Sequence, residues 1–212
     1  MTRYTQIRSL RRDGNCFYRA LVWQMFEYFL TDKSEKAKKQ YQDILAKVTK
    51  SKQDLMDLGF DAIVIDDFYD AFLDNYKNLE TDYIDPTNEK EVHEYLERIL
   101  SNNETTPYIL IHLRYMTSCY LKTNAILYQD FMVEYPDVNS YCQIEVEGVD
   151  HEADQMAIIG ITNYLDIAVE INRVQENGMI EINTFPEDAK DDDSKFKAKL
   201  LFTPGHYDAL YL

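Results

Sequence analysis

A single cysteine lies where a polar turn meets an apolar, helix-like pattern near the start of the chain. The stretch DGNCFYRAL places Cys16 directly after the turn Asp13-Gly14-Asn15. A helix that begins at Cys16 leaves unpaired backbone N–H groups and the positive end of the helix dipole beside the thiol. Both favour the thiolate, so this position predicts an acidic, nucleophilic cysteine. A buried cysteine that only fills space is the common alternative, and on this stretch alone the two interpretations are about equally favoured.

The turn before the cysteine has chemistry of its own. Its backbone amides, which include those of Gly14 and Asn15, can hold a developing oxyanion beside Cys16. Gly14 carries no side chain that would obstruct an approaching substrate backbone. The turn therefore predicts an oxyanion hole if Cys16 is a nucleophile.

A nucleophilic thiol needs a base, and that base needs a group that orients it. The C-terminal stretch TPGHYDALYL offers His206 and, two residues later, Asp208. In a strand these two side chains point to the same face, so Asp208 can hold the imidazole in one tautomer while His206 faces Cys16. A lone strand histidine is more often a satisfied surface or core residue, but the neighbouring carboxylate favours the catalytic interpretation. The other three histidines lie in an apolar helical pattern, a charged helical pattern and an acidic loop, namely His112, His93 and His151.

Helical patterns fill most of the chain between these two ends. Apolar residues recur at spacings of three and four, which predicts helices over residues 16–30, 34–58, 66–79, 89–100 and 153–165. The apolar run after Thr106 could be a buried strand, but Thr106 as N-cap and Pro107 at the first helical position favour a buried helix. Two further short helices are expected in NAILYQDFMVEY and VNSYCQIEVEG.

The pattern changes to strands near the end of the chain. DIAVEINRV and MIEINTF are β-branched or alternating and are separated by the turn ENG, and AKLLF and HYDALYL are joined by TPG. Helices first and strands last predict one α+β domain over residues 1–212, in which a helical N-terminal part packs on an antiparallel sheet.

The composition excludes several classes of function and of location. The chain has 212 residues and a net charge of -16, which argues against a general nucleic-acid binder because such proteins need a basic face. No apolar run reaches membrane-spanning length. Three cysteines form a poor disulfide framework, which indicates an intracellular protein of the cytoplasm, with the nucleus also allowed. Four histidines without CxxC or HxxxH spacing predict no metal site.

The motifs at the two ends resemble those of the ovarian-tumour (OTU) cysteine proteases, and within them the otubains, peptidase family C65. DGNCFYRAL and PGHYDALY carry the resemblance, and YILIHLRYMTSCYL, YCQIEVEGVDHEADQMAIIGITNYL and KLLFTPGHYDALYL are otubain-like in the expected order. The resemblance covers nearly the whole chain and is patchiest between about residues 32 and 105. It implies the papain-like OTU fold and a deubiquitinase.

The resemblance also implies a role for each residue. Cys16 is the nucleophile, His206 is the base and then the acid, Asp208 orients His206, and Asp13 supports the oxyanion turn. The implied reaction cleaves the isopeptide bond after the C-terminal glycine of ubiquitin and needs no cofactor. The implied partners are ubiquitin and polyubiquitin chains, and ubiquitin-conjugating enzymes are allowed. We expect a monomer that binds neither nucleic acid nor membrane.

By the same resemblance, the distal ubiquitin is held by the C-terminal half, near residues 144–151, 159–171 and 181–187. Acidic groups and one histidine lie in or beside the first segment, and ubiquitin's tail is basic. A solvated acidic face is the commoner role of such a cluster. The residues expected to contact ubiquitin are Glu145, Glu147 and His151, with Asp150 and Glu152 nearby.

Otubains prefer the chain linkage that directs proteins to the proteasome, and the resemblance extends that expectation to this chain. They usually carry a longer segment before the cysteine motif, part of which contacts the proximal ubiquitin, whereas twelve residues precede Asp13 here. We therefore expect this chain to keep the linkage preference but to cleave di-ubiquitin weakly. Two alternatives stay open: a non-catalytic protein that binds ubiquitin or a ubiquitin-conjugating enzyme, and a protease for a ubiquitin-like modifier.

Overall fold

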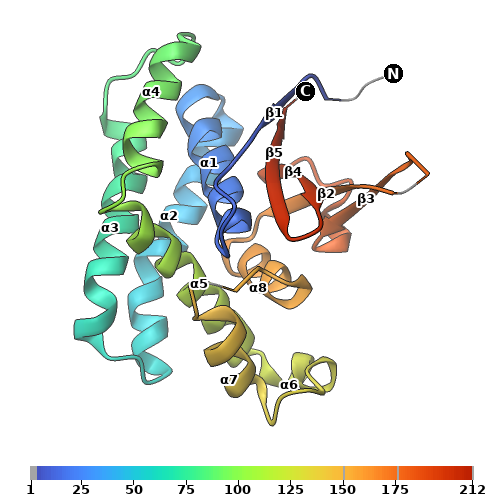
Figure 1. Ribbon diagram of the computed structural model, residues 1–212. Helices are drawn as coiled ribbons and strands as arrows, with labels where there is room; N and C mark the ends of the chain where they lie inside the picture. The colour runs from blue at the N-terminus through green and yellow to red at the C-terminus, as the bar shows by residue number, and fades with distance from the viewer. Residues whose placement is uncertain (1–3, 150, 176, 212) are drawn as a thin grey trace.

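The computed structural model describes residues 4–149, 151–175 and 177–211 and places the helices before most of the strands (Figure 1). Within these residues the α-helices are α1 (Cys16–Thr31), α2 (Glu35–Asp57), α3 (Ala62–Thr81), α4 (Glu89–Leu100), α5 (Thr106–Thr123), α6 (Ala125–Tyr128), α7 (Val138–Tyr141) and α8 (Gln155–Leu165). Three shorter helical segments are the 3₁₀ turns η1 (Gln129–Phe131) and η3 (Glu187–Ala189) and the π-helical turn η2 (Cys142–Val146). The predicted helices are all present.

The strands form one five-stranded sheet in the order β1-β5-β4-β2-β3. Their bounds are β1 (Gln6–Arg8), β2 (Ala168–Val174), β3 (Ile180–Phe185), β4 (Lys197–Thr203) and β5 (His206–Tyr211). The α+β class is confirmed, but the expectation of a purely antiparallel sheet is wrong because β2 and β4 run parallel. The chain leaves β3 at the sheet edge and returns on the other side of β2, and strand periodicity does not reveal which strands pair.

Side-chain caps explain where several helices begin. Ser34 accepts from the Ala37 N–H at the start of α2, and Asp154 accepts from the Ala157 N–H at the start of α8. Asp61 caps α3, which therefore begins at Ala62, four residues before the predicted start. At α5 the N-cap is Thr105 rather than the predicted Thr106.

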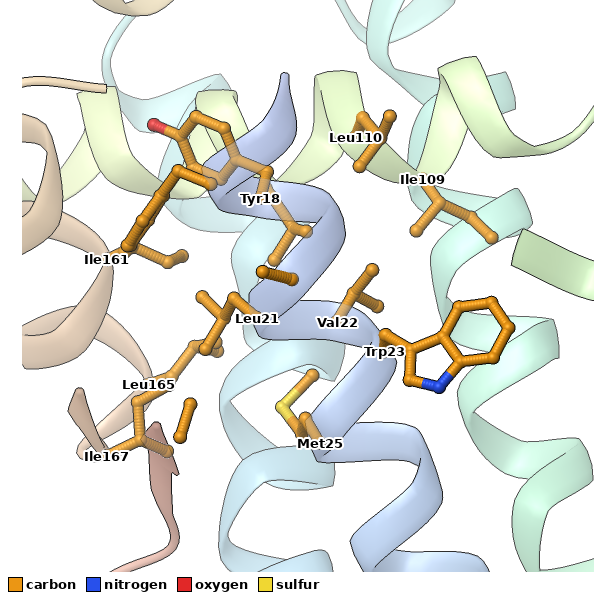
Figure 2. Packing of buried hydrophobic residues seen from close by; sticks show 14 of the residues in the cluster. Tyr18, Leu21, Val22, Trp23, Met25, Ile109, Leu110, Ile161, Leu165 and Ile167 are labelled. Atoms are coloured by element: carbon orange, nitrogen blue, oxygen red, sulfur yellow. The ribbon is translucent and has the colours of Figure 1, made fainter. Parts of the chain in front are cut away.

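Helix α1 carries the candidate nucleophile and lies between helices α3 and α4 on one side and the sheet on the other (Figure 1). Twelve of its sixteen residues are buried, so nearly its whole circumference is covered and packing rather than propensity stabilises it. Figure 2 shows this packing, in which Leu21 and Met25 of α1 lie near Leu165 and Ile167. Burial of each such side chain contributes about 1.5–3 kcal/mol.

A buried amide sets the position of α1 against the sheet. Gln24 Nε2 donates to the carbonyl oxygens of Leu210 at 2.8 Å and Lys199 at 3.1 Å, and Gln24 Oε1 accepts from the Lys199 N–H at 2.7 Å. These bonds tie one helix to both β4 and β5. They therefore limit how far α1 can slide along the strand that carries His206.

His112 is fully buried in α5, as the apolar pattern around it predicts. Its Nε2 lies 2.8 Å from Ser51 Oγ on α2, and Ser51 Oγ donates to the Val48 carbonyl. The rings of Tyr69 and Phe72 lie against it. Burial lowers the pKa of His112 from 6.5 to about 3, so the native protein keeps this imidazole neutral.

This buried histidine predicts acid-dependent stability. The unfolded chain binds a proton near pH 6.5 that the folded protein excludes down to about pH 3, so the stability is complete above pH 6.5 and is lost as pH falls. At pH 5 the loss from this one group is about 2 kcal/mol. Urea unfolding of wild type and His112→Gln at pH 7.5 and pH 5 measures it. Equal losses in the two proteins would assign the acid sensitivity to other groups.

Candidate active site

His206 and Asp208 form a buried, oriented pair on β5. His206 Nε2 lies 2.8 Å from Asp208 Oδ1, and both side chains are buried, at 1% and 8% exposure. Asp208 Oδ1 also accepts from the Leu10 N–H at 2.9 Å, which fixes the carboxylate. The structure therefore places these two side chains on one face of a strand, as the sequence predicts.

The pairing defines which ring nitrogen is free to act. With Nε2–H donated to Asp208, the Nδ1 of His206 carries the lone pair, and it has no hydrogen-bond partner among the described residues. The hairpin before His206 is closed by Gly205, whose φ of +74° suits glycine. The TPG turn therefore fixes where β5 begins, and His206 is the first residue of that strand.

Cys16 begins α1 and its thiol lies against the backbone next to His206. The backbone N–H of Tyr207 lies close enough to the thiol to lower its pKa, and the ring centroids of Phe17 and Tyr207 lie 5.5 Å apart. The structure thus brings together the two predicted reacting residues from opposite ends of the sequence.

The expectation of an acidic thiol is wrong for this resting state. Burial raises the pKa of Cys16 above its usual range, although the Tyr207 and Phe17 N–H groups act in the opposite direction. Cys16 is 1% exposed. The helix start alone does not ionise the thiol, so attack requires a base to remove its proton.

The turn before Cys16 is held by Asp13. Asp13 Oδ1 accepts from the Asn15 N–H at 3.0 Å, and Asp13 Oδ2 accepts from Arg19 Nη2 at 2.9 Å. The Cys16 N–H donates to the Asp13 carbonyl at 3.1 Å. Asp13 therefore holds the shape of the turn, and its role in the reaction stays a prediction.

These hydrogen bonds occupy amides that were expected to form the oxyanion hole. In this state the amides of Asn15 and Cys16 both donate within the turn, so neither is free to bind an oxyanion without a local rearrangement. The predicted role of Gly14 and Asn15 as oxyanion-hole residues stays a prediction. The orientation of their peptide planes decides whether the hole is open.

Glu152 is a charged residue of the site. The sequence did not predict that it acts on Cys16. Its carboxylate raises the pKa of Cys16 after the larger effect of burial, and its own pKa is raised by burial and lowered by His206. Its Oε2 lies 4.0 Å from the point where a Cβ on Gly205 would be. An acidic loop residue carries no sequence signal that would place it beside a cysteine more than a hundred positions away.

Replacement of this carboxylate should make the nucleophile more acidic. In Glu152→Gln we expect a lower pKa for Cys16 and an increase of about two- to tenfold in the rate of iodoacetamide alkylation at pH 7, because the thiolate fraction rises. The pH dependence of alkylation measures the pKa directly. A profile that superimposes on that of wild type would remove Glu152 from the electrostatics of the site.

The three residues expected to contact ubiquitin have different environments. Glu145 accepts from the Tyr135 hydroxyl and lies 3.0 Å from His151 Nδ1, and both Glu145 and His151 remain partly exposed. Glu147 accepts from Lys122 Nζ and Ser118 Oγ, each at 2.6 Å. Its charge is therefore already paired, and Glu145 and His151 offer the more accessible groups. Asp150 lies outside the described residues.

No helix among the described residues is long and apolar enough to cross a membrane. The same residues contain no group of three His, Cys, Asp or Glu side chains that could hold a metal ion. The chemistry that the described groups support is nucleophilic: a buried thiol, an imidazole with an available Nδ1, and a carboxylate that orients it.

Comparison with known proteins agrees with this geometry. A family profile described as Peptidase C65 Otubain matches residues 1–212. The chain is 33% identical over 211 residues to human Ubiquitin thioesterase OTUB1, a match that covers 99% of this chain and 71% of that protein. It is 29% identical over 210 residues to human Ubiquitin thioesterase OTUB2, covering 99% of this chain and 82% of that protein.

Solved structures give the same result. A complex of ceOTUB1 with ubiquitin aldehyde and UBC13~Ub matches with a TM-score of 0.80 at 30% identity, covering 98% of this chain and 79% of that chain. A complex of h/ceOTUB1 with ubiquitin aldehyde and UBCH5B~Ub matches with a TM-score of 0.81 at 30% identity, covering 98% of this chain and 76% of that chain.

Proposed function

Because the chain belongs to the peptidase C65 otubain family, we propose that it hydrolyses the isopeptide bond between the C-terminal glycine of ubiquitin and a lysine. It is a cysteine-type deubiquitinase, like the ubiquitin thioesterases to which it is similar. The observation that carries the proposed reaction is the buried His206–Asp208 pair beside the Cys16 thiol.

The proposed reaction uses one proton shuttle. His206 Nδ1 takes the thiol proton as Cys16 Sγ attacks the carbonyl carbon, and Asp208 stabilises the imidazolium. The tetrahedral intermediate collapses as the C–N bond breaks, and His206 gives the proton to the departing lysine amine. Water then attacks the thioester while His206 takes its proton. The bond to sulfur breaks, a carboxylic acid leaves and the thiol regains its proton.

We expect ubiquitin's basic tail to meet the accessible acidic groups of the segment around Glu145. Glu145→Lys should raise KM for ubiquitin-aminomethylcoumarin severalfold at low salt and less at high salt, because rim charges act mainly through steering. Glu94→Lys, the same charge change on the exposed face of α4, is the matched control. Equal KM values for Glu145→Lys and wild type at low salt would leave Glu145 as a solvated surface group.

The finer proposal is a preference for the linkage that directs proteins to the proteasome. A panel of di-ubiquitins of every linkage tests it, with fusions to a ubiquitin-like modifier as a second substrate class. Selective cleavage of one linkage supports the proposal, whereas equal cleavage of all linkages contradicts it. Faster cleavage of the ubiquitin-like fusion would assign the protein to that modifier.

A second candidate function is binding to a ubiquitin-conjugating enzyme. Relatives of known structure are complexes with UBC13~Ub and UBCH5B~Ub. This chain exposes apolar residues beyond the ends of α2 and α5, and Lys122 near the end of α5 lies 4.7 Å over the ring of Phe60, which follows α2. The exposed apolar residues are Leu58, Ile63 and Val64 after α2, and Ile126, Leu127, Phe131 and Val133 after α5.

Exposed apolar patches of this kind commonly mark interaction sites. We expect Phe131→Lys to weaken binding of such a conjugating enzyme while hydrolysis of ubiquitin-aminomethylcoumarin is retained, because Phe131 is 69% exposed and takes no part in the contacts described for Cys16, His206 and Asp208. Titration calorimetry with each protein measures the first effect. Unchanged affinity would remove this surface from the interaction.

A further inference from the structure

Arg114 is a fully buried arginine whose partners lie in two loops beside the active site. It projects from α5, is 0% exposed, and its guanidinium lies 4.8 Å over the Tyr18 ring. Burial of a charged group is costly unless each donor finds an acceptor. The positions of those acceptors therefore indicate what the residue does.

Two of its bonds hold the turn before the nucleophile. Arg114 Nη2 donates to the Gly14 carbonyl at 2.7 Å, and Nε donates to Asn15 Oδ1 at 2.8 Å. Two others hold the segment that precedes Glu152: Nη1 donates to the Val146 carbonyl at 3.0 Å, and Nη2 donates to the His151 carbonyl at 2.7 Å. One rigid guanidinium thus links the two loops.

The bond to Gly14 has a specific geometric effect. The Gly14 carbonyl and the Asn15 N–H belong to one planar peptide unit. Arg114 holds the oxygen of that unit, and Asp13 Oδ1 accepts from its N–H at 3.0 Å. The plane of this peptide is therefore fixed from both sides. An oxyanion hole depends on the direction of such amides.

We propose that Arg114 is a positioning residue that holds the Gly14 carbonyl, so that the Asn15 N–H of the same peptide needs only to leave Asp13 Oδ1 to stabilise an oxyanion. The same guanidinium ties this peptide to the carbonyls of Val146 and His151. The inference rests on the proposed nucleophilic function of Cys16 and deepens it. A bound substrate that displaces the backbone at Val146 or His151 would therefore move Arg114 and, with it, the Gly14 carbonyl. Arg114 acts on the reaction through these backbone contacts.

The test compares two reactions of Cys16 that differ in their need for an oxyanion hole. Acylation by p-nitrophenyl acetate passes through a tetrahedral oxyanion, whereas alkylation by iodoacetamide does not. In Arg114→Lys, whose ammonium cannot reproduce the fork of donors, we expect acylation to fall about 10²-fold with alkylation unchanged. For ubiquitin-aminomethylcoumarin, kcat should fall similarly while KM stays within about threefold.

A stability loss alone must not produce this result. Ser51→Ala removes the buried bond to His112 and serves as the matched destabilised control, with an expected lower melting temperature and an unchanged acylation-to-alkylation ratio. Asn15→Ala removes the acceptor of Nε without emptying the core, so it tests the proposal if Arg114→Lys does not fold. The Asn15→Ala ratio should fall in the same direction by a smaller factor.

The outcomes separate this inference from the function on which it rests. The ratio of the two small-molecule reactions requires no ubiquitin, so it reports on Arg114 even if ubiquitin proves not to be the substrate. An unchanged ratio in folded Arg114→Lys, or in Asn15→Ala if the former is unfolded, overturns the positioning role. An equal fall in acylation and alkylation also overturns the positioning role, because it would show that the substitution changes the reactivity of the thiol itself.

Discussion

Cys16→Ala should lose hydrolysis of ubiquitin-aminomethylcoumarin by a factor on the order of 10⁶, the scale on which proteases depend on their nucleophile. The thiol lies against the backbone of Tyr207, the residue after His206, and alanine leaves nothing to form the thioester. A ubiquitin probe with a cysteine-reactive C-terminus should label wild type and fail to label the variant. Mass spectrometry of the labelled protein identifies the modified residue.

The other two cysteines supply the control. Cys119 and Cys142 are buried, and burial raises the pKa of Cys119 to about 11 and that of Cys142 to about 12, so both thiols stay protonated at neutral pH. Cys119→Ala should therefore retain labelling and turnover. Labelling that persists in Cys16→Ala would show that the nucleophile has been assigned to the wrong cysteine.

Removal of the orienting carboxylate should produce the second large effect. In Asp208→Ala we expect kcat to fall by about 10²- to 10⁴-fold, the upper end being the effect measured for a serine-protease triad. The imidazole would lose its partner at Nε2, so the ring and its Nδ1 lone pair would no longer be held in one orientation. KM should change little because Asp208 is buried behind His206.

Asp208→Asn divides this effect into its two parts. An amide oxygen can still accept from both His206 Nε2 and the Leu10 N–H, so orientation is retained while the negative charge is lost. We therefore expect Asn to restore part of the activity that Ala loses. Unchanged turnover in Asp208→Ala would mean that another group orients the histidine, and equal losses in Ala and Asn would assign the whole effect to charge.

The sequence alone predicted those parts of the site that lie close together in the chain. His206 and Asp208 are two positions apart in a strand, so periodicity places them on one face. The helix that starts at Cys16 follows from apolar spacing. The start of α3 was predicted late because Ile63 and Val64 are exposed and break the apolar pattern, although Asp61 caps the helix.

Features set by distant contacts were not predictable in this way. Strand β1 is three residues long and forms only because β5 offers it a partner. The parallel pairing of β2 with β4 depends on where the chain goes after β3. The hydrogen bonds from Arg114 to the Gly14, Val146 and His151 carbonyls depend on loops that approach α5 only in the folded protein. The raised pKa of Cys16 follows from burial, which a helix-start argument does not contain.

The position of β5 between β1 and β4 has a consequence for synthesis of the protein on the ribosome. The nucleophile and its turn emerge before the base, which lies on β5, a strand that must insert between two strands that otherwise lack a common neighbour. Partial chains can fold helices from the N-terminal side as they emerge. The cysteine therefore lacks its base while the residues between them are synthesised, and hydrolytic activity begins only when β5 is in place.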